Sequence, residues 1–416
     1  MIKMFSMYKG LPRSIYILFL ARVVNSMGMF VYPFLTLFLS KKIGLSDSEV
    51  GFYMLLASTT FVPGAFIGGK LTDHFGRKKI LLIFQSLAAL TFISCGFMGN
   101  SMIVTWLLIT ASLFNGIADP STGAMVTDLT EPKNRKAAFS LLYLGINIGV
   151  AIGPIIAGFL FENYTRWIFW GDGLTTVIAL SLVLIYVPDT KPTEEEIKQT
   201  NDKLSENEKA ELGSVFKALL KRPFLIGFAV IYSLLTFSYS QHAFSIPLQL
   251  NDIFGDASSK MFGTIMSVNA IVVLIMTVPL TNLTKKLKPV QNVSIVGILY
   301  ALGFGMIYYI DYFPFFIIST MFWTMGEILA VTNVGVYIAN HSPITHRGRF
   351  SSFLNILSGA GYALGPAMMG IYIESYGVRQ VWILLFFISI GAFILLNLHH
   401  RLEVWSKKKK VLVRKS

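Results

Sequence analysis

Three ionisable residues stand out inside long apolar stretches of this 416-residue chain, namely Arg22, Asp119 and Glu327. A charged side chain is costly in apolar surroundings, so a residue of this kind is by default a candidate for function. A carboxyl group in such surroundings is suited to binding and releasing a proton, and a nearby arginine can hold a carboxylate in its charged form. The three residues are therefore candidates for coupled proton transfer.

The same residues also have a structural interpretation. Arg22 and Asp119 can form a static ion pair that holds two helices together, and Glu327 can be a hydrogen-bonded structural carboxyl. Glu327 is the stronger candidate for proton transfer, because pairing with Arg22 would hold Asp119 in its charged form.

Polar and aromatic side chains in the same apolar stretches are candidates for lining a binding cavity. Most aromatic residues in such stretches serve packing, and a lone histidine such as His242 is most often simply hydrogen-bonded. The candidates are Asn25, Tyr32, Asn115, Tyr232, Tyr239, Gln241, His242, Asn269, Trp323 and Asn333.

The elements that carry these residues are predicted to be membrane-spanning helices. The chain is 54% hydrophobic and 14% charged, whereas soluble domains have about 25% charged residues. Twelve apolar segments are each long enough to cross a bilayer core of about 30 Å. They are apolar on every face, unlike the alternating strands of a barrel. This composition excludes a water-soluble enzyme and a disordered chain, and the single cysteine, Cys95, excludes a disulfide scaffold.

The predicted fold class is an all-α integral membrane protein with two six-helix bundles. The predicted spans are 13–39, 49–70, 79–98, 102–126, 136–161, 167–187, 222–249, 260–283, 290–309, 312–340, 349–373 and 379–399. The predicted domains are residues 1–187, a polar linker at 188–221, residues 222–399, and a basic tail at 400–416.

The charge distribution predicts the orientation in the membrane. The net charge is +13, and most of the 35 lysines and arginines lie in the N-terminal stub, the even-to-odd loops, the linker and the tail. By the positive-inside rule, these segments and both termini are cytoplasmic. The basic excess is then a topology signal, so we expect no nucleic-acid partner. The sequence has no metal-ligand spacing and no nucleotide-phosphate loop, so we expect no metal and no cofactor.

The two halves of the chain are related by a shift of 212 residues. Landmarks that coincide include Arg135 with Arg347, Gly153-Pro154 with Gly365-Pro366, and Trp170 with Trp382. All of them lie between the fourth and sixth spans and in the corresponding part of the second half, so the repeat is parallel. Transporters built in this way place their substrate site near the membrane midplane, at the interface of the repeats.

A short motif joins the second and third spans. It reads Gly69-Lys-Leu71-Thr-Asp73-His-Phe-Gly76-Arg77-Lys78-Lys79, and it resembles the G-x-L-x-D-x-x-G-R-K signature of the major facilitator superfamily. The resemblance implies a cytoplasmic gate in which Asp73 and Arg77 interact with Asp128 at the end of span 4 and with the start of span 11. We refer to Gly69, Asp73, Gly76, Arg77, Lys78 and Asp128 as the gate motif.

The fifth span contains Gly149, Gly153, Pro154 and Gly158. This pattern is similar to the superfamily's G-x-x-x-G-P-x-x-G-G element, with Ala157 in place of one glycine, and in that family it marks drug/proton antiporters. We refer to these four residues as the span 5 hinge. A packing seam without such meaning is the alternative, since span 11 repeats the pattern. The arginine that family antiporters often have in span 4 is replaced here by Ser112.

The resemblance covers the whole chain and implies a secondary transporter that works by alternating access around spans 1, 4, 7 and 10. Its expected activity is proton-coupled efflux of drugs or other lipophilic compounds, in which Arg22, Asn25, Asp119 and Glu327 converge on one aqueous site. The alternatives are transport of a sugar, amino acid, peptide or lysolipid, and more remotely a receptor or enzyme. We expect a small-molecule substrate, membrane lipids as partners, a monomer, and the plasma membrane of a bacterium.

Overall fold

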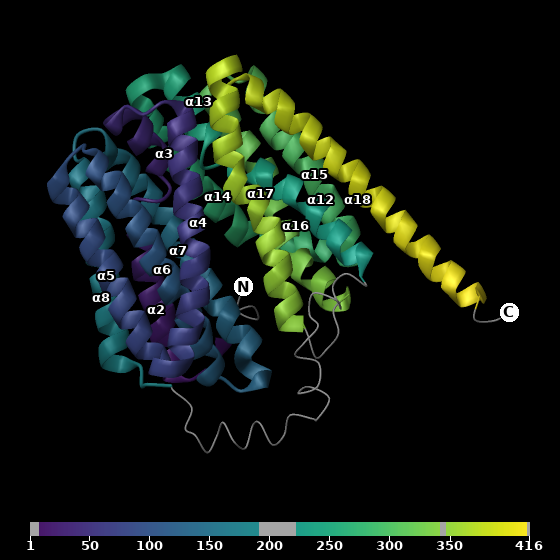
Figure 1. The fold of residues 1–416 in the computed structure, drawn as a ribbon, viewed down its shortest axis with the longest axis horizontal. Coiled ribbons are helices and arrows are strands. Elements are labelled where there is room, and N and C mark those ends of the chain that lie inside the picture. Colours follow the sequence, from purple (N-terminus) through teal and green to yellow (C-terminus); the bar gives the residue numbers. More distant parts are fainter. Residues whose placement is uncertain (1–7, 191–221, 342–346, 414–416) are drawn as a thin grey trace. The chain divides into compact units, whose positions relative to one another are not determined.

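The computed structural model describes residues 8–190, 222–341 and 347–413, and it has no strand within them (Figure 1). The linker predicted at 188–221 therefore lies outside the described residues from position 191 onward. The helices of the first half are α2 Arg13–Met27, α3 Leu35–Leu37, the π-helix η2 Phe38–Ile43, α4 Asp47–Phe75, α5 Arg77–Met98, α6 Met102–Asp128, α7 Pro132–Phe161 and α8 Thr165–Tyr186. Those of the second half are α12 Pro223–Ser240, α13 Ser245–Phe254, the 3-10 turn η3 Gly255–Ala257, α14 Ser258–Thr284, α15 Pro289–Met306, the 3-10 turn η4 Ile307–Tyr309, α16 Phe313–His341, α17 Arg347–Tyr376 and α18 Gln380–Val413.

The helical fold class is confirmed. Ten helical segments among the described residues are long and apolar enough to cross a membrane. One of these segments, Pro223–Thr284, contains both the seventh and the eighth predicted spans. The first predicted span is not among the ten, because its helix is interrupted and α2 has only 15 residues.

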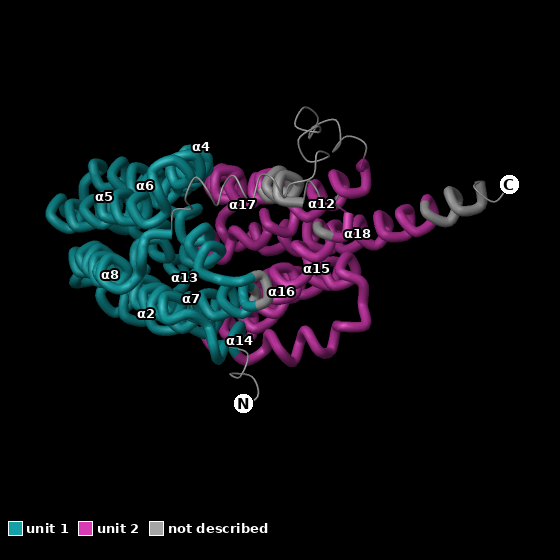
Figure 2. Tube along the Cα trace, turned by 90° about the horizontal axis from the view of Figure 1, so that it is seen from below, with its two compact units in different colours: residues 1–197, 246–274 teal, residues 198–245, 275–416 magenta. Residues whose placement is uncertain are grey.

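The chain forms two compact units, coloured separately in Figure 2. The first unit comprises residues 1–197 and 246–274, and the second comprises residues 198–245 and 275–416. The first unit thus contains α2–α8 together with α13 and most of α14, and the second contains α12 and α15–α18.

Two of the predicted spans are broken helices rather than continuous ones. The span predicted at 13–39 is interrupted over residues 28–34, and the span predicted at 222–249 is interrupted over residues 241–244. In the first break, Gly28 ends α2 and Pro33 has no N–H to continue the hydrogen-bond ladder. The two breaks fall at corresponding positions of the 212-residue repeat, so the interruption is a feature of the repeated unit.

The loop between the second and third spans is shorter than predicted. Helix α4 continues to Phe75 and α5 begins at Arg77, so only Gly76 links them. Gly76 has a φ of +103°, a backbone conformation that glycine adopts without the steric cost of a Cβ. Gly69 and Asp73 are therefore helical, not part of a loop. The single-residue link fixes the start of α5, and with it Arg77, directly beside the end of α4.

Candidate functional site

The Glu327 carboxyl in the second unit is surrounded by tyrosines. The Tyr239 hydroxyl donates a hydrogen bond to it. The hydroxyls of Tyr232, Tyr300 and Tyr362 are close enough to interact with its charge. Four helices bring these groups together, namely α12, α15, α16 and α17. We call Glu327, the four tyrosines, His242 and Trp323 the Glu327 cluster.

The rings of the Glu327 cluster other than that of Tyr232 gather around Tyr239. The centre of the Tyr239 ring is 4.4 Å from that of His242, 6.0 Å from that of Tyr300 and 6.3 Å from that of Tyr362. Trp323 completes the group, with its ring centre 6.1 Å from that of Tyr239 and 5.6 Å from that of His242. Aromatic rings at such separations attract one another, so the cluster is a cohesive unit.

The second unit positions the Glu327 cluster through one close helix contact and one break. Tyr300 lies against Gly326, where an added Cβ would be 2.6 Å from the Tyr300 ring, so the α15 ring approaches α16 directly beside Glu327. His242 lies in the break after α12, and its Nδ1 is 2.6 Å from the Tyr239 carbonyl oxygen. The broken span 7 thus places His242 next to the tyrosine that binds Glu327.

The Glu327 cluster has buried members and an exposed edge. Trp323, Tyr300 and His242 are buried. Tyr362 is 38% exposed, and Glu327 is half-buried. The indole N–H of Trp323 is buried and has no hydrogen-bond partner among the described residues. A buried donor without a partner is unusual and calls for an explanation, such as a ligand or an ordered water.

Arg22 and Asp119 lie near each other in the first unit. Each acts electrostatically on the other. Both residues belong to the described part of the chain, and neither an ion pair nor a hydrogen bond joins them. The static ion pair considered from the sequence is therefore absent. Arg22 and Asn25 line a small pocket together with Gln85 and Thr122, and the Arg22 Nε is buried without a hydrogen-bond partner among the described residues.

The other predicted cavity residues have local partners within their own units. Asn25 donates to Thr176 at 3.0 Å, and Asn115 donates to the Tyr32 hydroxyl at 3.3 Å. Asn292 donates to Asn333 at 2.8 Å. The Gln241 side chain spans the second break, donating to Phe237 and Ser240 and accepting from Ser245, while Asn269 is buried in α14. The predicted convergence of Arg22 with Glu327 involves residues of different units and stays a prediction.

Asp172 is a buried carboxylate that the sequence interpretation overlooked. It lies in α8, within the sixth predicted span, and its Oδ2 accepts the Val31 N–H at 3.2 Å. This N–H belongs to the break in span 1, where the helical ladder does not satisfy it. Asp172 therefore supports the broken helix. The sequence could have revealed Asp172, because an ionisable residue inside a membrane span is by default a candidate for function.

The gate motif is organised around Arg77. Its Nε donates to Asp128 at 2.9 Å, its Nη1 donates to the Thr72 carbonyl at 3.3 Å, and its contact with Asp73 is longer at 3.7 Å. The Lys78 ammonium donates to the Leu184 and Val187 carbonyls at the end of α8, where a cation also interacts favourably with the helix dipole. The role of these residues as a gate stays a prediction.

The span 5 hinge packs against the broken helix of span 1. A Cβ at Gly153 would be 2.7 Å from the Met27 carbonyl oxygen, and one at Gly149 would be 2.6 Å from the Met27 nitrogen. The repeat copy in span 11 does the same to span 7, since a Cβ at Gly365 would contact Ser240 and lie 2.9 Å from Gln241 Nε2. Both copies therefore pack closely against the end of a broken helix.

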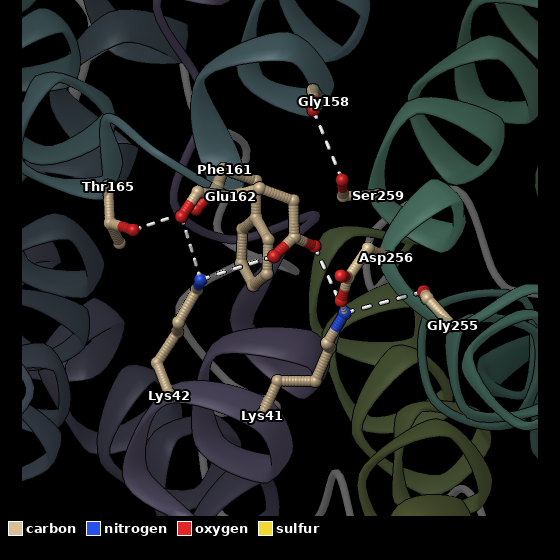
Figure 3. A network of polar contacts seen from close by, with 9 residues as sticks. All are labelled: Lys41, Lys42, Gly158, Phe161, Glu162, Thr165, Gly255, Asp256 and Ser259. Atoms are coloured by element: carbon tan, nitrogen blue, oxygen red, sulfur yellow. Dashed lines mark hydrogen bonds and ion pairs between the residues drawn. The ribbon is translucent and has the colours of Figure 1, made fainter.

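An ionic network in the first unit lies next to Gly158, the last residue of the span 5 hinge (Figure 3). Glu162, just after α7, accepts from Lys41 at 3.0 Å and from Lys42 at 3.3 Å. Lys41 also contacts Asp256 at 3.3 Å, and Ser259 donates to the Gly158 carbonyl at 3.2 Å. This network attaches the start of α14 to α7 and η2.

Comparison with known proteins identifies the family. The model of the Major Facilitator Superfamily matches residues 18–343 and 234–411, and the chain belongs to this superfamily. It is 26% identical to an uncharacterised MFS-type transporter of Bacillus subtilis, YqjV, over 87% of this chain and 86% of the relative. It is 22% identical to a Na⁺, Li⁺, K⁺/H⁺ antiporter of Planococcus maritimus, over 82% and 85% of the two chains.

A solved structure has the same fold. A POT family transporter in complex with a thioalcohol-conjugated peptide matches with a TM-score of 0.76 and 15% identity, over 96% of this chain and 97% of that one. The chain is thus a membrane transporter with the fold of this superfamily, built from a parallel repeat.

Proposed function

We propose that this protein is a proton-coupled efflux transporter for drugs or other lipophilic compounds. The observation that carries the proposal is the Glu327 carboxyl, which lies within a membrane-spanning helix and is hydrogen-bonded to Tyr239 among aromatic rings. Such a group can exchange a proton between its neutral and charged forms, and the surrounding rings suit an apolar substrate. The resemblance of the span 5 hinge to that of drug/proton antiporters supports export.

The proposed mechanism is alternating access of the two repeats, driven by the proton gradient without a cofactor. The chain works as a monomer in the bacterial plasma membrane, among its lipids and with cytoplasmic termini. Broken helices at spans 1 and 7 support this mechanism, because discontinuous helices form the substrate and ion sites of many secondary transporters.

Proton-coupled transport of monovalent metal ions is the second candidate. The observation in its favour is the similarity to the Na⁺, Li⁺, K⁺/H⁺ antiporter over most of both chains.

The test is efflux of several lipophilic cations from vesicles that contain the purified protein, with an imposed pH gradient. We expect transport to stop when an ionophore collapses the gradient, and to be lost in Glu327→Gln. Transport that continues without the gradient would contradict proton coupling. Gradient-driven movement of Na⁺ or K⁺ in place of the lipophilic compounds would favour the second candidate.

A further inference from the structure

A contact between α16 and α18 involves a buried carboxyl that belongs neither to the gate motif nor to the Glu327 cluster. His341 is the last residue of α16 and Glu403 lies on α18, each just beyond the predicted span of its helix. The His341 Nε2 is 2.8 Å from the Glu403 Oε1, and the His341 Nδ1 is 2.8 Å from the Tyr337 carbonyl oxygen. Glu403 is only 5% exposed. One histidine thus joins the end of α16 to a buried carboxyl of α18.

Both ring nitrogens of His341 face oxygen atoms, and this determines the protonation state that the contact favours. A neutral imidazole has one N–H donor and one acceptor nitrogen, whereas the protonated ring donates from both. Both contacts are therefore hydrogen bonds only when the ring carries two protons or when Glu403 itself carries one. The Tyr337 hydroxyl donates to the Glu403 Oε2 at 3.3 Å, and a donor to a carboxyl favours its charged form. The geometry therefore fits a protonated His341 paired with a charged Glu403.

We propose that His341 and Glu403 form a pH-sensitive clasp, which holds the end of α18 against α16 while the imidazole is protonated and releases it when the ring loses that proton. Histidine is the side chain whose charge ordinarily changes between about pH 5 and 8. The folded contact favours the protonated ring, so the stability that it provides is present at low pH and is lost as the pH rises. By the predicted topology both helix ends are cytoplasmic, so the clasp responds to the pH of the cytoplasm. This inference goes beyond the proposed function, because it concerns control of the helix ends and not the coupling at Glu327.

Loss of the proton leaves Glu403 in unfavourable surroundings, and movement of α18 relieves them. A buried charge that loses its partner is strongly destabilised, and the carboxylate regains water when the end of α18 moves away from α16. Leu402 and Trp405 beside it are 59% and 62% exposed, so little else covers this part of the helix. One turn earlier, the His399 Nε2 is 2.7 Å from the Phe224 carbonyl oxygen. The helix therefore stays anchored at His399, and the released part begins after that residue.

The charged and titratable side chains that adjoin His341 within the described residues come from α12, α16 and α18. The ring centre of Tyr337, one turn earlier in α16, is 4.1 Å from that of His341. Arg222, directly before α12, donates to the His341 carbonyl oxygen. Glu403 and His399 belong to α18, and the charges of His341 and Glu403 both act on His399. His399 is therefore a second histidine whose titration the test must separate from that of His341.

Two further helices pack against α16 and add no group that titrates near neutral pH at this end. Helix α15 has no charged residue along its length. Helix α17 begins with Arg347 and Arg349 in its first turn, and arginine keeps its charge throughout this pH range. The pH response of the clasp is thus expected to follow a histidine.

The test is hydrogen exchange of the backbone amides of residues 400–406, measured on the purified full-length parent and on His341→Gln at each pH. The ratio of the two exchange rates at the same pH cancels the intrinsic pH dependence of exchange. At about pH 5 we expect the variant to exchange about 10-fold faster or more, because it has lost a hydrogen bond to a charged group. The ratio should fall toward 1 as the pH rises past about 8. Glu403→Gln should behave like His341→Gln, whereas His399→Gln should keep the pH dependence of the parent.

Three results would overturn the proposal. A rate ratio above 1 that does not change with pH would show that the contact holds α18 without depending on a proton, and a ratio of 1 at every pH would show that it does not hold α18. Loss of the pH dependence in His399→Gln would assign the response to His399. If His341→Gln does not fold, Glu403→Gln takes its place in the comparison, because it removes the same charge pair and keeps the size of the side chain. The experiment uses neither a substrate nor a proton gradient, so its outcome is independent of the proposed function.

Discussion

Single polar residues support the broken helices of this transporter, and Asp172 is the clearest example. It accepts the Val31 N–H at 3.2 Å from a buried position in α8. Where a helix is broken within a membrane, neighbouring groups must satisfy the freed backbone donors. Asp172 is therefore part of the scaffold that shapes span 1. Tyr32, in the same break, accepts a hydrogen bond from Asn115 of α6 at 3.3 Å, so a second helix also contacts the break.

Replacing Asp172 should destabilise the protein in a graded way. In Asp172→Ala the buried Val31 N–H loses its acceptor, which we expect to lower the free energy of unfolding by about 1–3 kcal/mol. Asp172→Asn keeps an oxygen acceptor of the same size and should lose less. Reversible unfolding in detergent measures both variants. An alanine variant as stable as the asparagine variant would show that this hydrogen bond does not support the break.

The stability of the protein should depend on pH through Asp311 and Arg379, which lie outside the spans. Hydrogen bonding to the Arg379 guanidinium lowers the pKa of the exposed Asp311 carboxyl below its ordinary value of 3.8. Because the pKa is lower in the folded state, the pair stabilises the protein above pH 3.8, and this contribution is lost as the pH falls through the lowered value. Asp311→Asn should therefore reduce the unfolding temperature slightly at pH 6 and less at pH 3. A difference that does not change with pH would contradict this assignment.

At the scale of the elements, small residues let span 5 and span 11 pack against the broken helices. Gly365 shows this directly, since an added Cβ would meet Ser240 and Gln241, whose side chain spans the second break. A Cβ at Gly391 in α18 would meet no atom within 4 Å. The two glycines are thus a matched pair for testing the close contact.

We expect Gly365→Ala to destabilise the protein and Gly391→Ala to be neutral or slightly stabilising. Alanine is favoured over glycine in a helix by about 1 kcal/mol, so a loss at position 365 must come from the contact with the broken helix. Unfolding temperatures of the two variants give the answer. Similar temperatures for both would mean that the packing at Gly365 relaxes without cost.

The sequence predicted much of the fold, and its failures have physical causes. The spans and their helical type follow from the length and hydropathy of each segment, which the bilayer dictates. The breaks were missed because a few irregular residues inside an apolar run barely change its hydropathy, although Gly28 and Pro33 marked the first one. Glu327, Tyr239, Trp323 and His242 were all predicted as candidates, but their association depends on packing between helices far apart in sequence. Tyr300 and Tyr362 were overlooked because tyrosines in membrane spans usually serve packing.

At the scale of the molecule, the segment 246–274 packs as part of the first unit, and the Glu162 network is one of the contacts that hold it. Glu162 is 18% exposed and pairs with both lysines, whereas Asp256 is 93% exposed. Charged hydrogen bonds of partly buried groups contribute about 1.5–3 kcal/mol, and exposed ion pairs contribute about 0–1 kcal/mol. The stabilisation that this network provides should therefore come mainly from Glu162.

We expect Glu162→Gln to lower the free energy of unfolding clearly and Asp256→Asn to change it little. High salt should reduce the difference between Glu162→Gln and the parent only in part, because partly buried pairs are weakly screened. Unfolding at low and high ionic strength tests this expectation. Equal effects of the two variants on the free energy of unfolding would contradict this expectation, because Asp256 would then contribute as much as Glu162.

The most direct test of the account as a whole is proton release on ligand binding. Purified protein in weakly buffered detergent solution near neutral pH is mixed with methyltriphenylphosphonium, and the released protons are counted with a pH indicator. We expect the parent to release protons as the cation binds and Glu327→Gln to release none. A parent that binds the cation without releasing protons, or a Glu327→Gln variant that releases as many protons as the parent, would contradict the role of Glu327 as the group that couples proton and substrate.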